Sequence, residues 1–419
     1  MPAAKPPGDP ASRRGARRGG LRRRSEFFSD RNTLAVLNVL RQEHSISRAD
    51  IARMTGLTPA TVSSLVTRLQ SSSIVRITGF GESRGGRRPR LVEFFPDAFY
   101  LAGVDIGIEK AIALVTDLHG RIRSRARITL VPSEGREKTL RNVMSMTRSV
   151  LEQLGSGRKK VRGIGVSFPG LIDADRGIAL QLPALPGWRE TPLVAAFRDE
   201  FGLPCCLEND AKAMALGEAW LGAGRGCKNI FATIIGRGIG GGIVLNGELY
   251  RGQYSTSGEI GHVTINPDGP RCSCGNRGCL EAMASGKALA AAAIRAARKG
   301  GAARIVREAK GNIEHITAEN VAAAARDGDA LALRLVNESA RYIGIGLAAV
   351  VNLLSPEMII IGGGLSRMGD FYLRTIKETI AARAFAHGLT MPRIALSTLG
   401  ENASCLGAAA LVLKEALSA

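Results

Sequence analysis

The chain has 419 residues, of which 45% are hydrophobic, and this length predicts two or three domains rather than one core. It contains no run of about eighteen apolar residues, and no apolar segment follows its basic N-terminus, which argues against a membrane span and a signal peptide. The formal net charge is +20, and residues 1–100 hold 18 Lys and Arg against 8 Asp and Glu, so about half of the excess lies there. Such concentrated positive charge indicates a polyanionic partner, with nucleic acid ahead of a membrane surface.

The first 27 residues are rich in proline, glycine, alanine and arginine. A segment of this composition cannot bury enough apolar surface to fold, so residues 1–27 are predicted to form a disordered, arginine-rich arm. The arm could lie on DNA phosphates and add affinity that depends on salt and not on sequence. A solubilising tail and a misassigned start of translation remain alternatives.

Three helices are predicted next, beginning with an apolar face that starts near Asn32. Ser47 is a helix N-cap, and the helix Arg48–Thr55 ends at Gly56. Thr58 and Pro59 provide the N-cap and first residue of another helix. Its apolar residues recur at helical spacing, and its other face carries small polar side chains that suit close entry into a major groove. Two helices joined by a tight glycine turn are typical of a helix-turn-helix.

A β-hairpin is predicted to complete this domain, which spans residues 28–98. Its strands, Val75–Ile77 and Leu91–Phe94, are joined by a glycine- and arginine-rich loop suited to a narrow minor groove. The alternative is that the helices and the ribbon contact protein. The candidate DNA-binding residues are Arg48, Pro59, Ala60, Thr61, Ser63, Ser64, Thr67, Arg68, Arg84, Arg87 and Arg88.

Strands and helices alternate from residue 99 onward, which predicts an α/β body. Strands are expected at 101–107, 111–116, 127–131, 163–167 and 358–362, and helices at 137–153, 285–299, 317–326, 330–354 and 403–417. A strand ending at Asn209 and Asp210 leads into a helix, and residues 234–243 form a glycine-rich hairpin.

A short segment contains the residue types of a closed metal site. His262, Cys272, Cys274 and Cys279 provide one imidazole and three thiols, a complete tetrahedral ligand set for structural Zn²⁺. Buried free cysteines and a core histidine are the alternative. The other cysteines show no disulfide-framework spacing, so a reducing, cytoplasmic location is expected.

The segment from Gly258 to His262, followed by Cys-x-Cys-Gly-x-x-Gly-Cys-Leu-Glu, resembles the signature of the ROK family of repressors, open reading frames and sugar kinases. The resemblance extends from about Asn32 onward, and the N-terminal domain resembles the winged helix-turn-helix of the repressor branch. It implies a two-lobed actin/hexokinase-like (ribonuclease H-like) body. Lobe 1 would span residues 99–210 with a C-terminal helix within 396–419, and lobe 2 would span 211–395 with the zinc knot.

The resemblance also implies a sugar site and a nucleotide site. The sugar-binding positions would be Asn209, Asp210, Glu259, His262 and Glu281, with Asp210 as the catalytic base if the protein is a kinase. On the phosphate side, family kinases carry Asp-Ile-Gly-Gly-Thr-Lys, whereas this chain has Ile108 and Glu109 in place of the second glycine and the threonine. A β-branched residue obstructs phosphate approach and an acid repels it, so ATP and Mg²⁺ are not expected. Arg237, where kinases usually have threonine, is ambiguous because it could still bind an anion.

The leading interpretation is therefore a sugar-responsive transcriptional regulator, which represses genes of carbohydrate utilisation. It would be cytoplasmic and associated with the nucleoid, would bind a double-stranded operator as a homodimer or homotetramer, and would sense a sugar without phosphorylating it. Two alternatives remain: an active ATP-dependent sugar kinase with an added DNA-binding domain, and a nucleic-acid-binding structural protein with a vestigial body.

Overall fold

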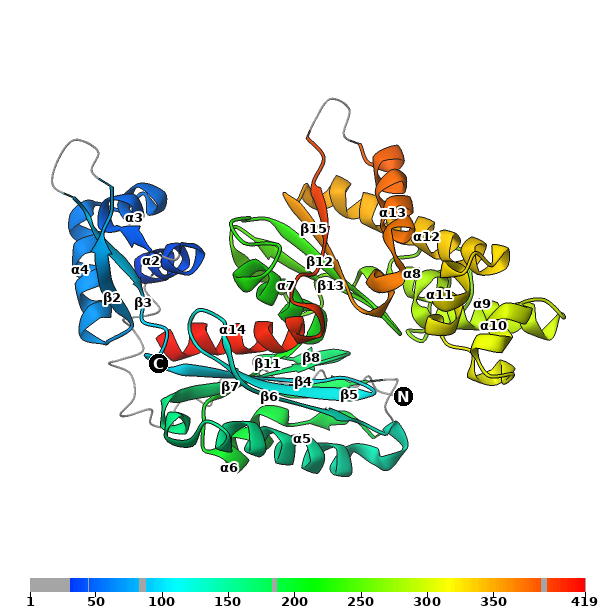
Figure 1. The fold of residues 1–419 in the computed structure, drawn as a ribbon, viewed down its shortest axis with the longest axis horizontal. Coiled ribbons are helices and arrows are strands. Elements are labelled where there is room, and N and C mark those ends of the chain that lie inside the picture. The colour runs from blue at the N-terminus through cyan, green and yellow to red at the C-terminus, as the bar shows by residue number, and fades with distance from the viewer. Residues whose placement is uncertain (1–30, 44, 83–87, 183–186, 386–389, 419) are drawn as a thin grey trace, which may run out of the picture.

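The computed structural model describes residues 31–43, 45–82, 88–182, 187–385 and 390–418. The predicted arm, residues 1–27, lies outside them. A small N-terminal domain lies at one end of the molecule, beside a body of two lobes (Figure 1). The predicted fold class is confirmed: a winged helix-turn-helix precedes an actin/hexokinase-like α/β body. No helix among the described residues is long and apolar enough to cross a bilayer.

The N-terminal domain packs three helices against a small antiparallel sheet. The helices are α2 (Arg31–Gln42), α3 (Arg48–Thr55) and α4 (Pro59–Ser71), and the strands are β1 (Ile46–Ser47), β2 (Val75–Phe80) and β3 (Arg90–Phe94), in the order β1-β3-β2. The predicted caps are present, because the Ser47 side chain accepts a hydrogen bond from Asp50 N and that of Thr58 accepts one from Thr61 N. Gly56 ends α3 at a φ of 70°, in the left-handed region that favours glycine.

Lobe 1 is built on a mixed sheet of five strands in the order β11-β7-β4-β5-β6. Helices α5 and α6 cover one face of this sheet, and α14 covers the other (Figure 1). A small antiparallel sheet, β10-β9-β8, lies beside it. The bounds are β4 (Tyr100–Ile106), β5 (Lys110–Thr116), β6 (Ile122–Thr129), α5 (Gly135–Glu152), β7 (Val161–Phe168), β8 (Leu171–Asp173), β9 (Ile178–Gln181), β10 (Arg189–Thr191), α6 (Leu193–Phe201), β11 (Cys205–Asn209) and α14 (Ala403–Ser418).

One strand of lobe 1 differs from the sequence prediction. It was expected at residues 127–131, but β6 begins at Ile122 and ends at Thr129. Its charged first half pairs with β5 along its length, and Arg123 and Arg125 form ion pairs with Asp117 and Glu401. The arginines made this segment resemble a loop in the sequence. In the structure it is a strand, because acidic residues outside it neutralise these arginines.

Lobe 2 contains a second sheet, in the order β14-β13-β12-β15-β16. The long helix α12 and its neighbours pack on one side of it, and α7 contacts β12 and β13 and also packs against α14. The bounds are α7 (Asp210–Leu221), β12 (Ile230–Ile235), β13 (Ile239–Leu245), β14 (Glu248–Tyr250), α8 (Leu280–Ala284), α9 (Gly286–Arg298), α10 (Ala303–Glu308), α11 (Ala318–Arg326), α12 (Ala330–Leu354), β15 (Met358–Gly362), α13 (Asp370–Arg383) and β16 (Arg393–Leu396). The sequence analysis did not predict α6, α8, α10 or α13.

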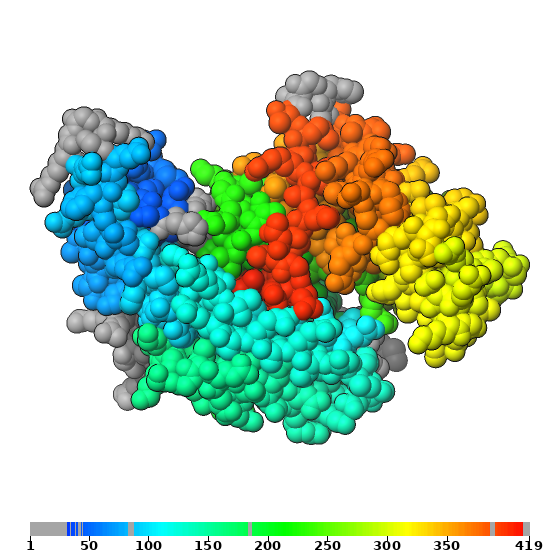
Figure 2. Space-filling model, in the orientation of Figure 1, coloured from blue at the N-terminus to red at the C-terminus, as the bar shows by residue number. Residues whose placement is uncertain are grey.

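The N-terminal domain is joined to the body by more than its connecting chain. One apolar cluster contains its core residues, such as Val36 and Val66, together with Leu101 of β4, Trp220 of α7 and Leu413 of α14. In the space-filling view the blue domain lies at one end of the molecule and the yellow helices of lobe 2 at the other (Figure 2).

Candidate functional site

Strand β13 brings the parts of the candidate sugar site together. A Cβ atom on Gly242 would lie 2.6 Å from Ala211 O, so the first turn of α7 packs directly against the strand. A Cβ on Gly241 would lie 2.5 Å from Gly258 O, so the 258–262 segment packs equally closely on it. The glycine-rich hairpin predicted at residues 234–243 therefore has a packing role: it allows the first turn of α7 and the 258–262 segment to approach one strand.

The first turn of α7 holds two of the predicted sugar-binding residues. Asn209 is its N-cap, with Oδ1 accepting hydrogen bonds from Ala211 N (3.0 Å) and Lys212 N (3.3 Å). Its Nδ2 donates to Gly170 O at 3.2 Å. The amide is thus fixed in orientation, and one Nδ2 hydrogen is left for a ligand.

Asp210 is half-buried and lies near a second half-buried acid, Asp105 at the end of β4. Burial, followed by the nearby charges of Asp105 and then Glu259, raises the pKa of Asp210 to about 7. Burial also raises the pKa of Asp105 to about 6, although Ser167 Oγ donates a hydrogen bond to its carboxylate and opposes the shift. Both carboxyl groups therefore change charge near neutral pH, as groups at binding and catalytic sites often do.

A lysine that the sequence analysis did not single out completes this group of charges. Lys212 is fully buried, and its ammonium has no hydrogen-bond partner among the described residues. Its Nζ lies 3.6 Å from Glu259 Oε1, close enough for an ion pair. The structure thus brings Asp210, Glu259 and Lys212 together from α7 and the 258–262 segment.

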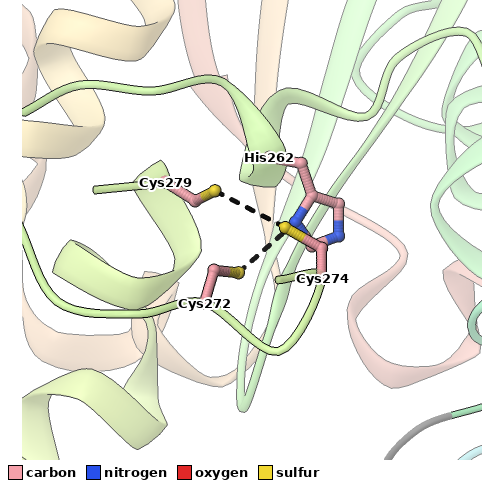
Figure 3. A group of neighbouring side chains, drawn as sticks. All are labelled: His262, Cys272, Cys274 and Cys279. Carbon is pink, nitrogen blue, oxygen red and sulfur yellow. Dashed lines mark hydrogen bonds between the residues drawn. The ribbon is translucent and has the colours of Figure 1, made fainter. Parts of the chain in front are cut away.

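The four predicted metal ligands converge in one cluster. Their side chains point toward one another (Figure 3), and all their ligand atoms lie within 4.8 Å of each other. Cys274 Sγ and Cys279 Sγ are 3.7 Å apart, and Cys272 Sγ is 3.6 Å from His262 Nδ1. Tetrahedral Zn²⁺ with bonds of about 2.3 Å to sulfur and about 2.0 Å to nitrogen requires separations of about 3.8 and 3.5 Å. The geometry therefore fits Zn²⁺.

The chemistry of the cluster also fits a cation. Burial, followed by hydrogen bonds with Cys274 and Cys272, raises the pKa of Cys279 to about 12. A divalent cation reverses this effect, because it stabilises adjacent thiolates. Because Nδ1 of His262 faces the cluster, Nε2 points away from it. His262 N also donates to Glu259 O at 3.1 Å, which links the cluster to the candidate sugar-binding segment.

The fifth predicted sugar-binding residue, Glu281, lies in the first turn of α8, and its side chain reaches the start of β13. Its Oε2 accepts a hydrogen bond from Ile239 N at 2.9 Å. The opposite side of the same residue, Ile239 O, lies against Gly261, where a Cβ would come within 2.1 Å. Glu281 and the 258–262 segment therefore meet at Ile239. Glu281 also lines a cavity of about 300 Å³ next to the cysteine cluster, together with Arg237 and Cys272.

The phosphate side contains an ion pair between the two lobes. Glu109, in the β4–β5 hairpin of lobe 1, accepts a hydrogen bond from Arg237, in the β12–β13 hairpin of lobe 2. These are two of the positions at which the chain departs from the kinase pattern. The sequence analysis did not decide whether Arg237 binds an anion. In the structure, Arg237 is paired with the carboxylate of Glu109.

The candidate DNA-binding face is centred on α4. Pro59, Ala60, Ser64, Thr67 and Arg68 are exposed, Thr61 and Ser63 are half-buried, and the apolar residues face inward. Arg48 donates a hydrogen bond to Gln70 at 3.2 Å and so joins α3 to α4. Arg88 is exposed, whereas Arg84 and Arg87 lie outside the described residues.

The fold and the site define a winged helix-turn-helix protein with a two-lobed ATPase-type body. The ROK family model matches residues 101–415, and a winged helix-turn-helix DNA-binding model matches residues 29–76. The chain therefore belongs to the ROK family.

Similar proteins include both repressors and kinases. The chain is 33% identical over 387 residues to a xylose repressor from Caldicellulosiruptor bescii, covering 92% of this chain and 96% of the relative. A glucokinase from Thermotoga maritima is 35% identical over 313 residues, covering 74% of this chain and 96% of the kinase. The solved structure of a ROK family transcriptional regulator, a homologue of the Escherichia coli Mlc protein, has a TM-score of 0.74 at 26% identity and covers 92% of this chain and 97% of its own. The kinase match covers less of this chain than the two regulators do.

Proposed function

We propose that this protein is a sugar-responsive, DNA-binding transcriptional repressor of carbohydrate-utilisation genes that senses a sugar without phosphorylating it. The proposal rests on one chain that combines a winged helix-turn-helix with all five predicted sugar-binding residues and an ion pair on the predicted phosphate side. Similarity over 92% of the chain to a xylose repressor supports it.

On the DNA side, α4 would enter a major groove. Its exposed residues are small or positively charged, so the helix can approach base edges closely and contact phosphates. Repressors of this architecture bind two half-sites, so the functional unit on a palindromic operator would be a homodimer or a homotetramer. This function places the protein with the DNA in the cytoplasm.

On the sugar side, Asn209, Asp210, Glu259, Glu281 and the Nε2 atom of His262 would bind hydroxyl groups. Zn²⁺ held by His262, Cys272, Cys274 and Cys279 would be structural, because four protein ligands leave no open position on the metal. The metal would bind Nδ1 of His262 and so fix the orientation of the ring, which leaves Nε2 for a hydrogen bond to a second group.

The Glu109–Arg237 ion pair favours sensing over catalysis. Phosphoryl transfer needs donors that stabilise negative charge on the phosphates. Here the arginine is already paired with a carboxylate of the facing lobe, and this carboxylate would repel a nucleotide phosphate. The alternative, an active sugar kinase, is favoured by Asp105 and Asp210, which occupy the metal-orienting and base positions of the family.

The test combines sugar binding, DNA binding and turnover. D-xylose, D-glucose and N-acetyl-D-glucosamine are tested by calorimetry, and the sugar that binds is then added to the protein on an operator selected from random duplexes. We expect Glu259→Ala to abolish the response to sugar while leaving operator binding intact. Sugar-dependent ATP consumption that is lost in Asp210→Ala would establish the kinase instead.

A further inference from the structure

Helix α7 connects the candidate sugar site with the DNA-binding domain. It begins at Asp210 and ends at Leu221, and its 12 residues span about 18 Å. Trp220, near its end, is 2% exposed and belongs to the apolar cluster that also contains the core of the N-terminal domain. The first turn of α7 thus lies in the candidate site, and its last turn belongs to the apolar cluster that includes the core of the N-terminal domain.

Helix α14 is fixed to α7 along their contact. Ser404 Oγ donates a hydrogen bond to Asp210 O at 3.0 Å, at the start of both helices. A Cβ on Gly407 would lie 1.7 Å from Ala213 O, so the two backbones are in direct contact. Farther along α14, Leu413 enters the same apolar cluster as Trp220. Close-packed interiors have low compressibility and transmit strain, so we expect a displacement of α7 to displace α14 with it.

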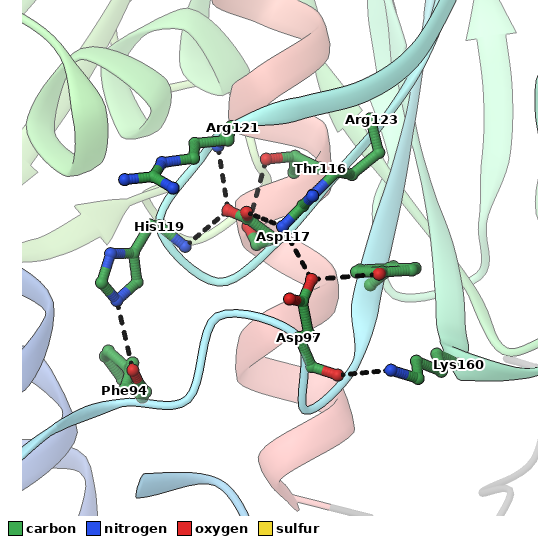
Figure 4. Close-up of polar contacts among 9 residues, drawn as sticks. Phe94, Asp97, Thr116, Asp117, His119, Arg121, Arg123 and Lys160 are labelled. Atoms are coloured by element: carbon green, nitrogen blue, oxygen red, sulfur yellow. Dashed lines mark hydrogen bonds and ion pairs between the residues drawn. The ribbon is translucent and has the colours of Figure 1, made fainter. Parts of the chain in front are cut away.

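The end of α7 makes a second contact that leads to the wing. Leu221 lies against Gly120, where a Cβ would come within 2.4 Å of Leu221 Cδ2. Gly120 belongs to the β5–β6 turn, and His119 of that turn contacts Phe94 O, at the end of β3, through Nε2 at 3.3 Å (Figure 4). Leu118 N of the turn donates to Pro96 O at 3.3 Å.

A buried acid holds this turn in place. Asp117 is fully buried, and its Oδ1 accepts hydrogen bonds from His119 N (2.9 Å) and Arg121 N (3.0 Å). Arg123 donates both to Asp117 (2.8 Å) and to Asp97 (2.7 Å) in the segment between the domains (Figure 4). The connection between wing and body is therefore braced by hydrogen bonds and ion pairs.

We propose that α7 and α14 form a strut that carries the sugar signal from Asp210 to the DNA-binding domain through Trp220 and Leu221. This inference rests on the proposed function and specifies its regulation. A sugar bound to Asn209 and Asp210 acts on the first turn of α7, and the strut moves the apolar cluster and the β5–β6 turn against β3. Two arrangements of the N-terminal domain would then differ in sugar affinity, which is the requirement for coupling two sites.

Fluorescence of Trp220 tests whether sugar binding at Asp210 changes the environment at the far end of α7. The chain contains 2 tryptophans, so Trp188→Phe leaves Trp220 as the only one. At about 15 Å from Asp210 along the helix, Trp220 is too distant for direct contact with a sugar in the site. We expect its emission to change over the sugar concentrations at which calorimetry detects binding. Binding without any change at Trp220 would overturn the strut.

A matched pair of leucine variants tests whether the contact at the end of α7 is needed. Leu221→Ala should reduce the effect of sugar on operator affinity from the roughly 5- to 150-fold of typical allosteric coupling to within about twofold. Operator affinity without sugar and the calorimetric sugar affinity should be retained. The control is Leu333→Ala, because Leu333 is also half-buried on a helix but packs on an apolar cluster that contains no residue of α14 or of the N-terminal domain.

The outcomes separate the two proposals. Undiminished coupling in Leu221→Ala would overturn the strut and leave the sugar-responsive repressor standing. If none of D-xylose, D-glucose and N-acetyl-D-glucosamine binds the wild type, the proposed function fails, and the strut fails with it.

Discussion

At the residue scale, Asp210 carries a charge that the fold disfavours. Its pKa is raised from 3.8 to about 7, so its ionisation destabilises the folded state as pH rises through this range. Asp210→Asn removes the ionisation and keeps an oxygen for the hydrogen bond from Ala211 N. We expect the variant to melt at a higher temperature than the wild type at pH 8, with the difference shrinking toward pH 4. Each unit of difference between the pKa values of the folded and unfolded states corresponds to about 1.4 kcal/mol of folding free energy. An equal difference in melting temperature at pH 8 and pH 4 would contradict a raised pKa of Asp210.

The positive charge of Lys212 opposes the rise in the pKa of Asp210. Lys212→Met keeps the apolar stem and removes the charge, so the pKa of Asp210 should rise further. If ionised Asp210 accepts a sugar hydroxyl, sugar affinity is lost as pH falls through the pKa of Asp210. This loss should begin at a higher pH in the variant than in the wild type. Calorimetry between pH 6 and 9 measures the displacement. The exposed Lys299→Met is the control, and a Lys212→Met profile that coincides with the control profile would refute the role of Lys212.

At the scale of elements, the cysteine cluster is predicted to stabilise the segment between β14 and α8. A structural metal contributes directly to folding free energy. Cys274→Ser should therefore lose bound zinc and lower the melting temperature of the body, whereas Cys206→Ser, outside the cluster, should retain both. Elemental analysis and thermal unfolding check this prediction. Much less than one metal ion per wild-type chain would disprove the zinc assignment.

Helix α4 is the element that should read DNA sequence. Ser64 is exposed in the middle of its outward face, between apolar residues that pack inward. Ser64→Arg would block close entry into a major groove, so specific operator affinity should fall at least about tenfold, the scale of one lost base contact. The fold should be unchanged, because no buried contact is removed. Gel-shift titration measures the loss, and unaltered specific binding would exclude α4 as the reading helix.

At the scale of the whole molecule, positive charge is concentrated toward the N-terminus. Each phosphate contact releases counterions, so log Kobs falls with log salt in proportion to the number of contacts. Deleting residues 1–27 should reduce this slope while preserving the preference for operator over random DNA. Arg88→Ala, in the wing of the folded domain, should weaken specific binding instead. Loss of sequence preference on deletion of the arm alone would reverse this division of labour.

The sequence alone determined the features whose signals are local. Cap residues at Ser47 and Thr58 and the glycine at 56 defined the helices of the DNA-binding domain, because these preferences act within one turn of a helix. The histidine and cysteine ligands could be predicted because metal coordination imposes residue types at short spacing. Family resemblance added the two-lobed body.

Only the tertiary structure decided which distant residues meet. Glu109 and Arg237 are separated by 128 positions, and neither residue type indicates that the other neutralises it. The glycine run at 240–242 showed only that side chains are absent, whereas the fold shows what approaches, namely α7 and the 258–262 segment. Likewise, an ammonium on a helix is ordinarily solvated. Lys212 is buried beside Glu259 because β13, α7 and the 258–262 segment close around it, and such packing depends on all three elements at once.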